Sequence, residues 1–257
     1  GIPFDENQLR AQLVALALSC ELISQEPNER VRRALATNLS DLLRYQNMLC
    51  RYDTMALKSL DVFSVHGFPV GLVQCESNLL GIPNGIKNAS VGSGGWSNIV
   101  DKYIKAKDYC DHPFEVRPRG NSKLRVPIIG EWIGEKRNSE RPEETRTVDI
   151  RCEDATEAHL APASLDAVFT DPPYFGNVQY AELMDFCYVW LRRLAPAEPY
   201  FRDKTSTRNA GELTGNESMN RGAEHFAAGL SSVFRKMAAA LKPGSPLAFT
   251  FHHNTIE

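Results

Sequence analysis

The spacing of apolar residues predicts two helices near the start of the chain. The first covers residues 5 to about 25, where apolar side chains return every three or four positions. After the break at Pro27-Asn28, a second pattern of this kind runs from about Glu29 towards Leu60. A solvated helix face accounts for the charged positions of this second helix better than a DNA-backbone contact does. Those positions are Arg30, Arg32, Arg33 and Arg44.

The middle of the chain is interrupted by glycine, proline and asparagine, and we expect irregular structure from residue 61 to residue 93. The glycine-rich stretch Val91–Trp96 has the composition of a phosphate-binding loop, but no apolar strand precedes it. We therefore interpret it as a loop that enters a helix, because an apolar stripe starts at Trp96. Short strands are expected at residues 127–129 and 132–133.

Strand patterns and helix patterns alternate in the last third of the chain, which predicts parallel strands joined by right-handed crossovers. The expected strands are Thr147–Cys152, Leu165–Thr170 and Pro246–Phe251, and the expected amphipathic helices cover residues 183–194 and 226–241.

A charged, proline-containing run from Glu135 to Arg146 precedes this part and is typical of an exposed connector. We therefore predict two parts: a mainly helical segment, residues 1–135, and an α/β part, residues 147–257.

Composition narrows the class of protein. The hydrophobic content of 42% and the charged content of 24% are ordinary for a soluble globular protein, and the net charge of −3 argues against a globally basic nucleic-acid binder. No apolar run approaches the thickness of a bilayer and no signal segment is seen, so we expect a cytoplasmic protein with no membrane partner. The six cysteines form no Cys-x-x-Cys pair, so we predict no metal site.

The stretch Thr170-Asp171-Pro172-Pro173-Tyr174 is the strongest candidate for chemistry. It follows a predicted buried strand, and ligands bind at the carboxyl ends of strands in open α/β sheets. The exocyclic amine of adenine or cytosine is a poor nucleophile, because its lone pair is delocalised into the ring. The Asp171 carboxylate and the Pro172 carbonyl can accept hydrogen bonds from such an amine and stabilise the positive charge that develops on attack.

Tyr174 can stack on a base that has been swung out of the duplex. These residues predict methylation of a nucleobase amine. The plain alternative is a structural Pro-Pro turn with an aspartate that caps a helix.

The same residues resemble the catalytic motif [D/N/S]-P-P-[Y/F/W] of the amino-methyltransferase superfamily that uses S-adenosylmethionine. The longer string TDPPYFGNVQYAELMDFCYVWLRR, from Thr170 to Arg193, resembles prokaryotic adenine-specific DNA methylases, many of which also carry a zinc ribbon. The string ALKPGSPLAFTFHH, residues 240–253, resembles the next strand of that family. The resemblance implies an α/β fold with a Rossmann-like methyltransferase sheet, whole or in part, behind a helical N-terminal segment. It also implies methyl transfer from S-adenosylmethionine to the exocyclic amine of adenine in DNA.

The resemblance assigns roles residue by residue. Asp171, Pro172, Pro173 and Tyr174 would form the catalytic loop, and Asp154, Ala155 and Asp171 would contact the cofactor. A helix N-cap is the plain alternative for Asp154. The base pocket would be lined by Tyr174, Phe175, Asn177, Tyr180 and His252. Core packing is the alternative for the aromatic residues, and simple exposure is the alternative for His252.

Several features of that family are missing from this sequence: the glycine-rich cofactor loop, a clear acidic residue at the end of the second strand and the zinc ribbon. The loop lies upstream in those proteins, and this sequence starts at Gly1 without a methionine, so we expect a piece of a longer protein. We also expect this piece to bind S-adenosylmethionine weakly or not at all. Calorimetry that showed micromolar binding would contradict that expectation.

Other functions stay open at this stage. They are N4 methylation of cytosine in DNA, N2 methylation of guanine in RNA, and a non-catalytic nucleic-acid-binding or assembly role. DNA is the expected partner, together with other components of restriction-modification or phage defence. The polar stretch Ala195–Gly222 is long for a connector, and we expect it to form a mobile loop on the substrate side. Plain disorder is the alternative.

Overall fold

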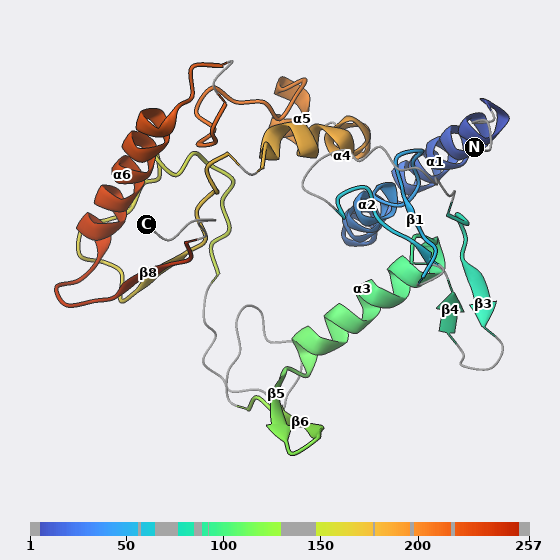
Figure 1. The fold of residues 1–257 in the computed structure, drawn as a ribbon, viewed down its shortest axis with the longest axis horizontal. Coiled ribbons are helices and arrows are strands. Elements are labelled where there is room, and N and C mark those ends of the chain that lie inside the picture. Colours follow the sequence, from blue (N-terminus) through green and yellow to red (C-terminus); the bar gives the residue numbers. More distant parts are fainter. Residues whose placement is uncertain are drawn as a thin grey trace.

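The computed structural model describes most of the chain, with gaps. The described residues are 6–55, 58–64, 77–84, 89–91, 93–129, 148–176, 178–195, 198–216 and 219–251. In this part of the chain the fold is mixed α/β, with six helices and small two-stranded sheets (Figure 1). The helices are α1 (Glu6–Ser24), α2 (Glu29–Leu43), α3 (Trp96–Asp111), α4 (Tyr180–Leu194), α5 (Pro199–Asp203) and α6 (Ala223–Ala240).

Helix α2 starts where the sequence predicts and ends earlier. The side chain of Asn28 accepts hydrogen bonds from the first backbone N–H groups of the helix and so caps it. The prediction that this helix continues towards Leu60 is wrong, because α2 ends at Leu43. There the side-chain amide of Asn47 donates to the carbonyls of Leu43 and Arg44, which would otherwise need helical partners.

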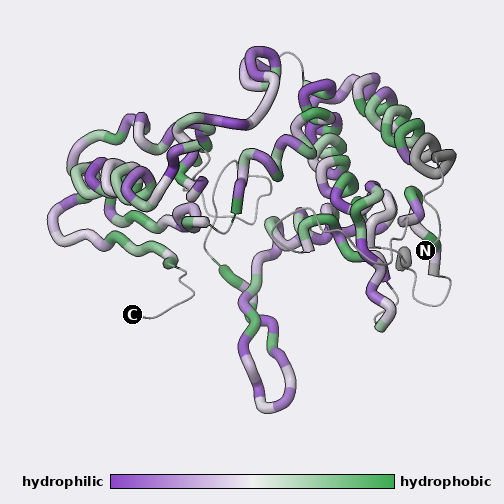
Figure 2. The backbone as a smooth tube through the Cα atoms, turned by 45° about the horizontal axis from the view of Figure 1, so that its top comes forward, coloured by the Kyte–Doolittle hydropathy of each residue, from purple (hydrophilic) through white to green (hydrophobic). Residues whose placement is uncertain are grey.

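The described strands form four separate pairs. Three pairs are antiparallel: β1 (Tyr52–Asp53) with β2 (Lys58–Ser59), β3 (Ile82–Asn84) with β4 (Ala89–Val91), and β5 (Phe114–Arg119) with β6 (Ser122–Pro127). The β5–β6 hairpin projects away from the helices in Figure 2. Its two-residue turn starts with Gly120, whose φ of +58° is the conformation that such turns need.

The fourth pair confirms the predicted parallel strands in the last third of the chain. Strand β7 (Val168–Thr170) pairs in parallel with β8 (Leu247–Phe249), and Thr170 lies opposite Phe249. One face of the pair packs on α6, where the rings of Phe234 and Phe249 lie 5.1 Å apart. The other face is open, since the side chain of Phe169 is 78% exposed.

The predicted strand Thr147–Cys152 is wrong for its described residues, 148–152. These residues are irregular and exposed, and the side chain of Ile150 is 89% accessible. A strand needs hydrogen-bond partners for its backbone, and no described strand pairs with this segment. A Rossmann-like sheet is therefore not seen among the described residues, where the parallel sheet has two strands.

The main hydrophobic core joins α4 to the N-terminal helices. Its buried members are Leu16, Cys20, Ile23, Leu39, Leu42, Leu43, Ile99, Cys187 and Leu194. Cys187 and Leu194 come from α4, and the other members come from α1, α2 and α3. The division into residues 1–135 and 147–257 stays a prediction, but this core contains side chains from both ranges.

No helix among the described residues combines the length and the apolar character that crossing a membrane requires.

Candidate active site

The Asp-Pro-Pro-Tyr turn leaves the sheet at the carboxyl end of β7. The strand ends at Thr170, residues 171–174 are irregular, and α4 begins at Tyr180. Between them Gly176 has a φ of +74°, in the left-handed region that glycine adopts without strain. A backbone of this shape presents the side chains of the turn at the strand end, where the sequence predicts the site.

Asp171 is exposed, and one oxygen of its carboxylate is held by two hydroxyl groups. The hydroxyl of Tyr174 donates to Oδ1 at 3.0 Å, and the hydroxyl of Thr250 donates to the same atom. The hydrogen bond from Thr250, followed by that from Tyr174, lowers the pKa of Asp171 below its ordinary value of 3.8. Asp171 is thus a charged acceptor at neutral pH.

Two acceptor atoms of this turn have no hydrogen-bond donor among the described residues. They are Oδ2 of Asp171 and the backbone carbonyl oxygen of Pro172. The two acceptors belong to consecutive residues, and an amino group carries two N–H donors, so the acceptors match it in number. That they bind an amine substrate stays a prediction.

Aromatic side chains surround the turn. The backbone N–H of Tyr174 lies 3.4 Å from the hydroxyl oxygen of Tyr180, the first residue of α4. The ring of Phe175 lies 5.4 Å from the ring of Phe226 on α6. Phe175 and Tyr180 are both partly exposed, so each has a packed side and an accessible side.

Asp154 lies at a turn of its own. Its Oδ1 accepts hydrogen bonds from the backbone N–H and the hydroxyl of Thr156, and these bonds lower the pKa of Asp154. This resembles the capping role that the sequence leaves open, although residues 155–157, with the exposed Ala155, form a turn and not a helix. Oδ2 of Asp154 has no hydrogen-bond donor among the described residues. No described hydrogen bond joins Asp154 to Asp171.

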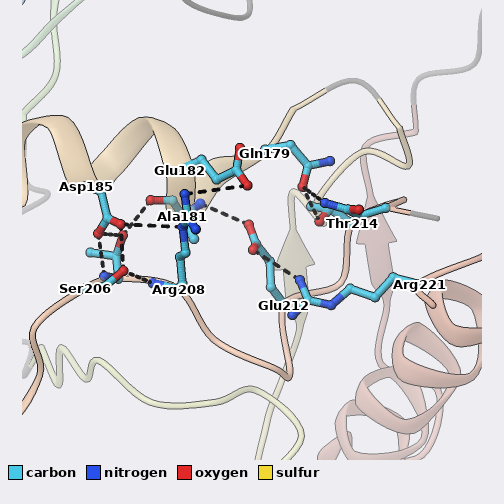
Figure 3. A network of polar contacts seen from close by, with 11 residues as sticks. Gln179, Ala181, Glu182, Asp185, Ser206, Arg208, Glu212, Thr214 and Arg221 are labelled. Atoms are coloured by element: carbon cyan, nitrogen blue, oxygen red, sulfur yellow. Dashed lines mark hydrogen bonds and ion pairs between the residues drawn. The ribbon is translucent and has the colours of Figure 1, made fainter. Parts of the chain in front are cut away.

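A polar network fixes residues 206–216 to α4, as Figure 3 shows. Asp185 accepts hydrogen bonds from the hydroxyl of Ser206 and from the backbone N–H of Thr207, both at 2.6 Å. Glu212 accepts a hydrogen bond from the backbone N–H of Ala181 at 3.0 Å and lies 3.5 Å from the buried Arg221. Glu212 therefore caps the start of α4, where a negative charge is favourable.

This fixed segment, residues 206–216, lies close both to Asp154 and to Phe175, which follows the Asp-Pro-Pro-Tyr turn. A Cβ atom on Gly211 would lie 3.1 Å from Oδ2 of Asp154, and one on Gly215 would lie 2.7 Å from the ring of Phe175. Disorder does not describe these residues, because they are held by the network on α4. Their mobility on the substrate side stays a prediction.

A shallow, open depression of about 540 Å³ lies next to the Asp154 turn. It is lined by Ala158, His159, Leu160, Ala161, Lys236 and Ala239. The hydrogen bonds from Thr156 are the main cause of the lowered pKa of Asp154, and the charge of Lys236 adds to them. Among the described residues, no three acidic, histidine or cysteine side chains are grouped as a metal ion would need.

Two predicted site residues, Asn177 and His252, lie outside the described residues. Thr250 and the network on α4 were not expected from the sequence. Thr250 lies in the predicted strand Pro246–Phe251, but its place beside Asp171 depends on the register of the β7–β8 pair, which the sequence does not reveal.

Comparisons of the chain with protein-family models, with curated proteins and with solved structures found no match.

Proposed function

We propose that the Asp171–Tyr174 turn methylates the exocyclic amine of adenine in DNA, within a Rossmann-like methyltransferase fold. The observation that carries the proposal is the pair of adjacent acceptors, Oδ2 of Asp171 and the carbonyl oxygen of Pro172, at the end of a parallel strand. Both accept hydrogen bonds from the target amine and stabilise the positive charge that grows on its nitrogen. Tyr174 and Tyr180 offer rings on which a flipped base stacks.

S-adenosylmethionine, when bound, supplies an electrophilic methyl group. The residues of the chain fit part of that cofactor, because Oδ2 of Asp154 has no described donor and is free to accept from the hydroxyls of a ribose. Ala155 leaves the adjoining surface open, since it carries no bulky side chain. In this proposal, Asp154 and Ala155 hold the adenosine and Asp171 holds the amine.

The test is transfer of a tritiated methyl group from S-adenosylmethionine to DNA and to RNA, with the complete protein that carries these residues. We expect label on adenine in DNA, and a loss of about 100-fold to 1,000-fold in kcat for Asp171→Ala, as for removal of one transition-state hydrogen bond. Asp166→Ala is the matched control, because Asp166 is an exposed partner of Lys242 near the same strand. Equal activity of Asp171→Ala and wild type would remove Asp171 from the mechanism. Transfer of the label to cytosine in DNA, or to guanine in RNA, would show that this base and not adenine is the substrate.

A second candidate is an assembly role without catalysis. It is favoured by apolar side chains that nothing described covers, among them Phe169 on the open sheet face and Val14 and Leu18 on α1. Absence of methyl transfer to any nucleic acid, with retained assembly into a larger complex, would favour this role over the enzyme.

A further inference from the structure

Thr250 is brought to the candidate site by strand pairing alone. Thr170 lies opposite Phe249 in the parallel β7–β8 pair, and the backbone N–H of Thr250 donates to the carbonyl of Thr170 at 3.1 Å. The next residue after each strand is therefore Asp171 on one side and Thr250 on the other. Their side chains meet, and the hydroxyl of Thr250 donates to Oδ1 of Asp171.

An exposed aspartate at the end of a strand would otherwise sample several rotamers. Here two hydroxyls, from Tyr174 and Thr250, bind the same oxygen atom, and hydrogen bonds to a charged group are stronger than those between neutral groups. The two donors are on separate segments of the chain, one in the turn and one after β8. Together they restrict the carboxylate while Oδ2 stays without a described donor.

We propose that Thr250 is a positioning residue, which fixes the Asp171 carboxylate through Oδ1 so that Oδ2 is presented to the substrate amine. The inference rests on the proposed function for the identity of that amine. The positioning of the Asp171 carboxylate does not rest on the proposed function, because it follows from the hydrogen bonds alone. Preorganisation of this kind raises the rate, since the acceptor need not reorient as charge develops on the nitrogen.

The first test measures Asp171 directly and needs no methyl transfer. Carboxyl-¹³C NMR of aspartate-labelled protein, assigned with Asp171→Asn, follows the titration of Asp171 in wild type, Thr250→Val and Thr250→Ser. Loss of the Thr250 hydroxyl removes the largest cause of the lowered pKa, so the midpoint for Thr250→Val moves up towards 3.8. Thr250→Ser keeps a hydroxyl and retains the wild-type midpoint. Thr37→Val, which removes an exposed hydroxyl on α2, leaves it unchanged.

An unchanged midpoint in Thr250→Val would overturn the inference, whether or not the protein methylates DNA. The second test compares steady-state rates in the complete protein. We expect kcat of Thr250→Val to fall about 10-fold to 100-fold with KM for DNA little changed, and Thr250→Ser to recover most of the loss. An equal kcat for Thr250→Val and wild type would also overturn it. Absence of methyl transfer in wild type would instead overturn the proposed function, and the NMR result would still decide whether Thr250 fixes Asp171.

Discussion

A Cβ atom on Gly94 would overlap the Cβ of Tyr45, so this buried position accepts no side chain unless its neighbours move. The carbonyl of Gly94 also accepts a hydrogen bond from the side chain of Gln46 at 2.8 Å. The N–H groups of Trp96 and Ser97 at the start of α3 donate to carbonyls of residues 79 and 80. Gly94 and Gly95 thus allow close packing, in agreement with the interpretation of this stretch as a loop that enters a helix.

We predict that Gly94→Ala destabilises the protein by about 1–3 kcal/mol, because the new methyl group overpacks a buried contact. Gly222→Ala is the control, since a Cβ there meets no atom within 4 Å. Gly222 is the N-cap of α6, where alanine is less favourable than glycine, so its replacement should cost about 0.5 kcal/mol, less than the cost expected for Gly94→Ala. Urea unfolding measures both variants, and equal midpoints would show that the region around Gly94 accommodates the methyl group at no greater cost than the exposed cap.

At the scale of the elements, the position of residues 206–216 depends on hydrogen bonds to Asp185 of α4. We predict that Asp185→Ala releases this segment at a cost of about 1–2 kcal/mol, because it leaves the half-buried hydroxyl of Ser206 and N–H of Thr207 without their acceptor. Hydrogen exchange at residues 206–216 should speed up. Asp203→Ala, which breaks an exposed ion pair with Arg202, should leave that exchange unchanged. Equal protection in Asp185→Ala and wild type would contradict the anchoring role.

The same hydrogen bonds predict how the stability of residues 206–216 depends on pH. Burial alone would raise the pKa of Asp185, but the hydrogen bonds from Ser206 and Thr207 outweigh it and the pKa is lowered. The contribution of Asp185 to stability is therefore present above its unfolded pKa of about 3.9 and is lost as the pH falls through the lower, folded value. Protection of residues 206–216 should stay constant from pH 7 to about pH 4 and decline only below this range. A decline that begins above pH 5 would contradict it.

Local signals predict the helices better than they predict the pairing of strands. Helices α1, α4 and α6 follow the spacing of their own apolar residues, because a helix forms its hydrogen bonds within one segment. The alternation in Thr147–Cys152 is just as regular, yet residues 148–152 form no strand, since a strand depends on a partner from elsewhere. The β5–β6 hairpin carries a turn signal, Gly120-Asn121 between two extended runs, that would have revealed it.

For the candidate site, the motif places Asp171 and Tyr174 at a strand end from sequence alone, and the structure has them there. The sequence does not reveal which segments approach the site. Gly211 and Gly215 come close to Asp154 and Phe175 only because side chains distant in the sequence hold their segment against α4. Contacts of this kind depend on the tertiary fold and have no local pattern.

At the scale of the whole molecule, α4 contributes to the helical core and starts beside the candidate site. We predict that Leu194→Ala, which removes a buried side chain at the far end of α4, costs about 2–5 kcal/mol. Leu22→Ala on the exposed side of α1 should cost under about 1 kcal/mol. Thermal unfolding measures both costs. If the core is one unit, hydrogen exchange should rise in α1, α2 and α4 together for Leu194→Ala, whereas a rise confined to α4 would contradict this.

The shared core also has a consequence for how the protein folds as it is synthesised. Helices α1 and α2 leave the ribosome before α4, and the core that buries Leu39 and Leu42 is closed only when Leu194 has been added, about 150 residues after Leu43. At about 5–20 residues per second, the apolar faces of the first two helices wait roughly 8–30 s for their partner. Such a nascent chain is a natural client for chaperones that bind exposed apolar segments, and slower translation would lengthen its period of exposure.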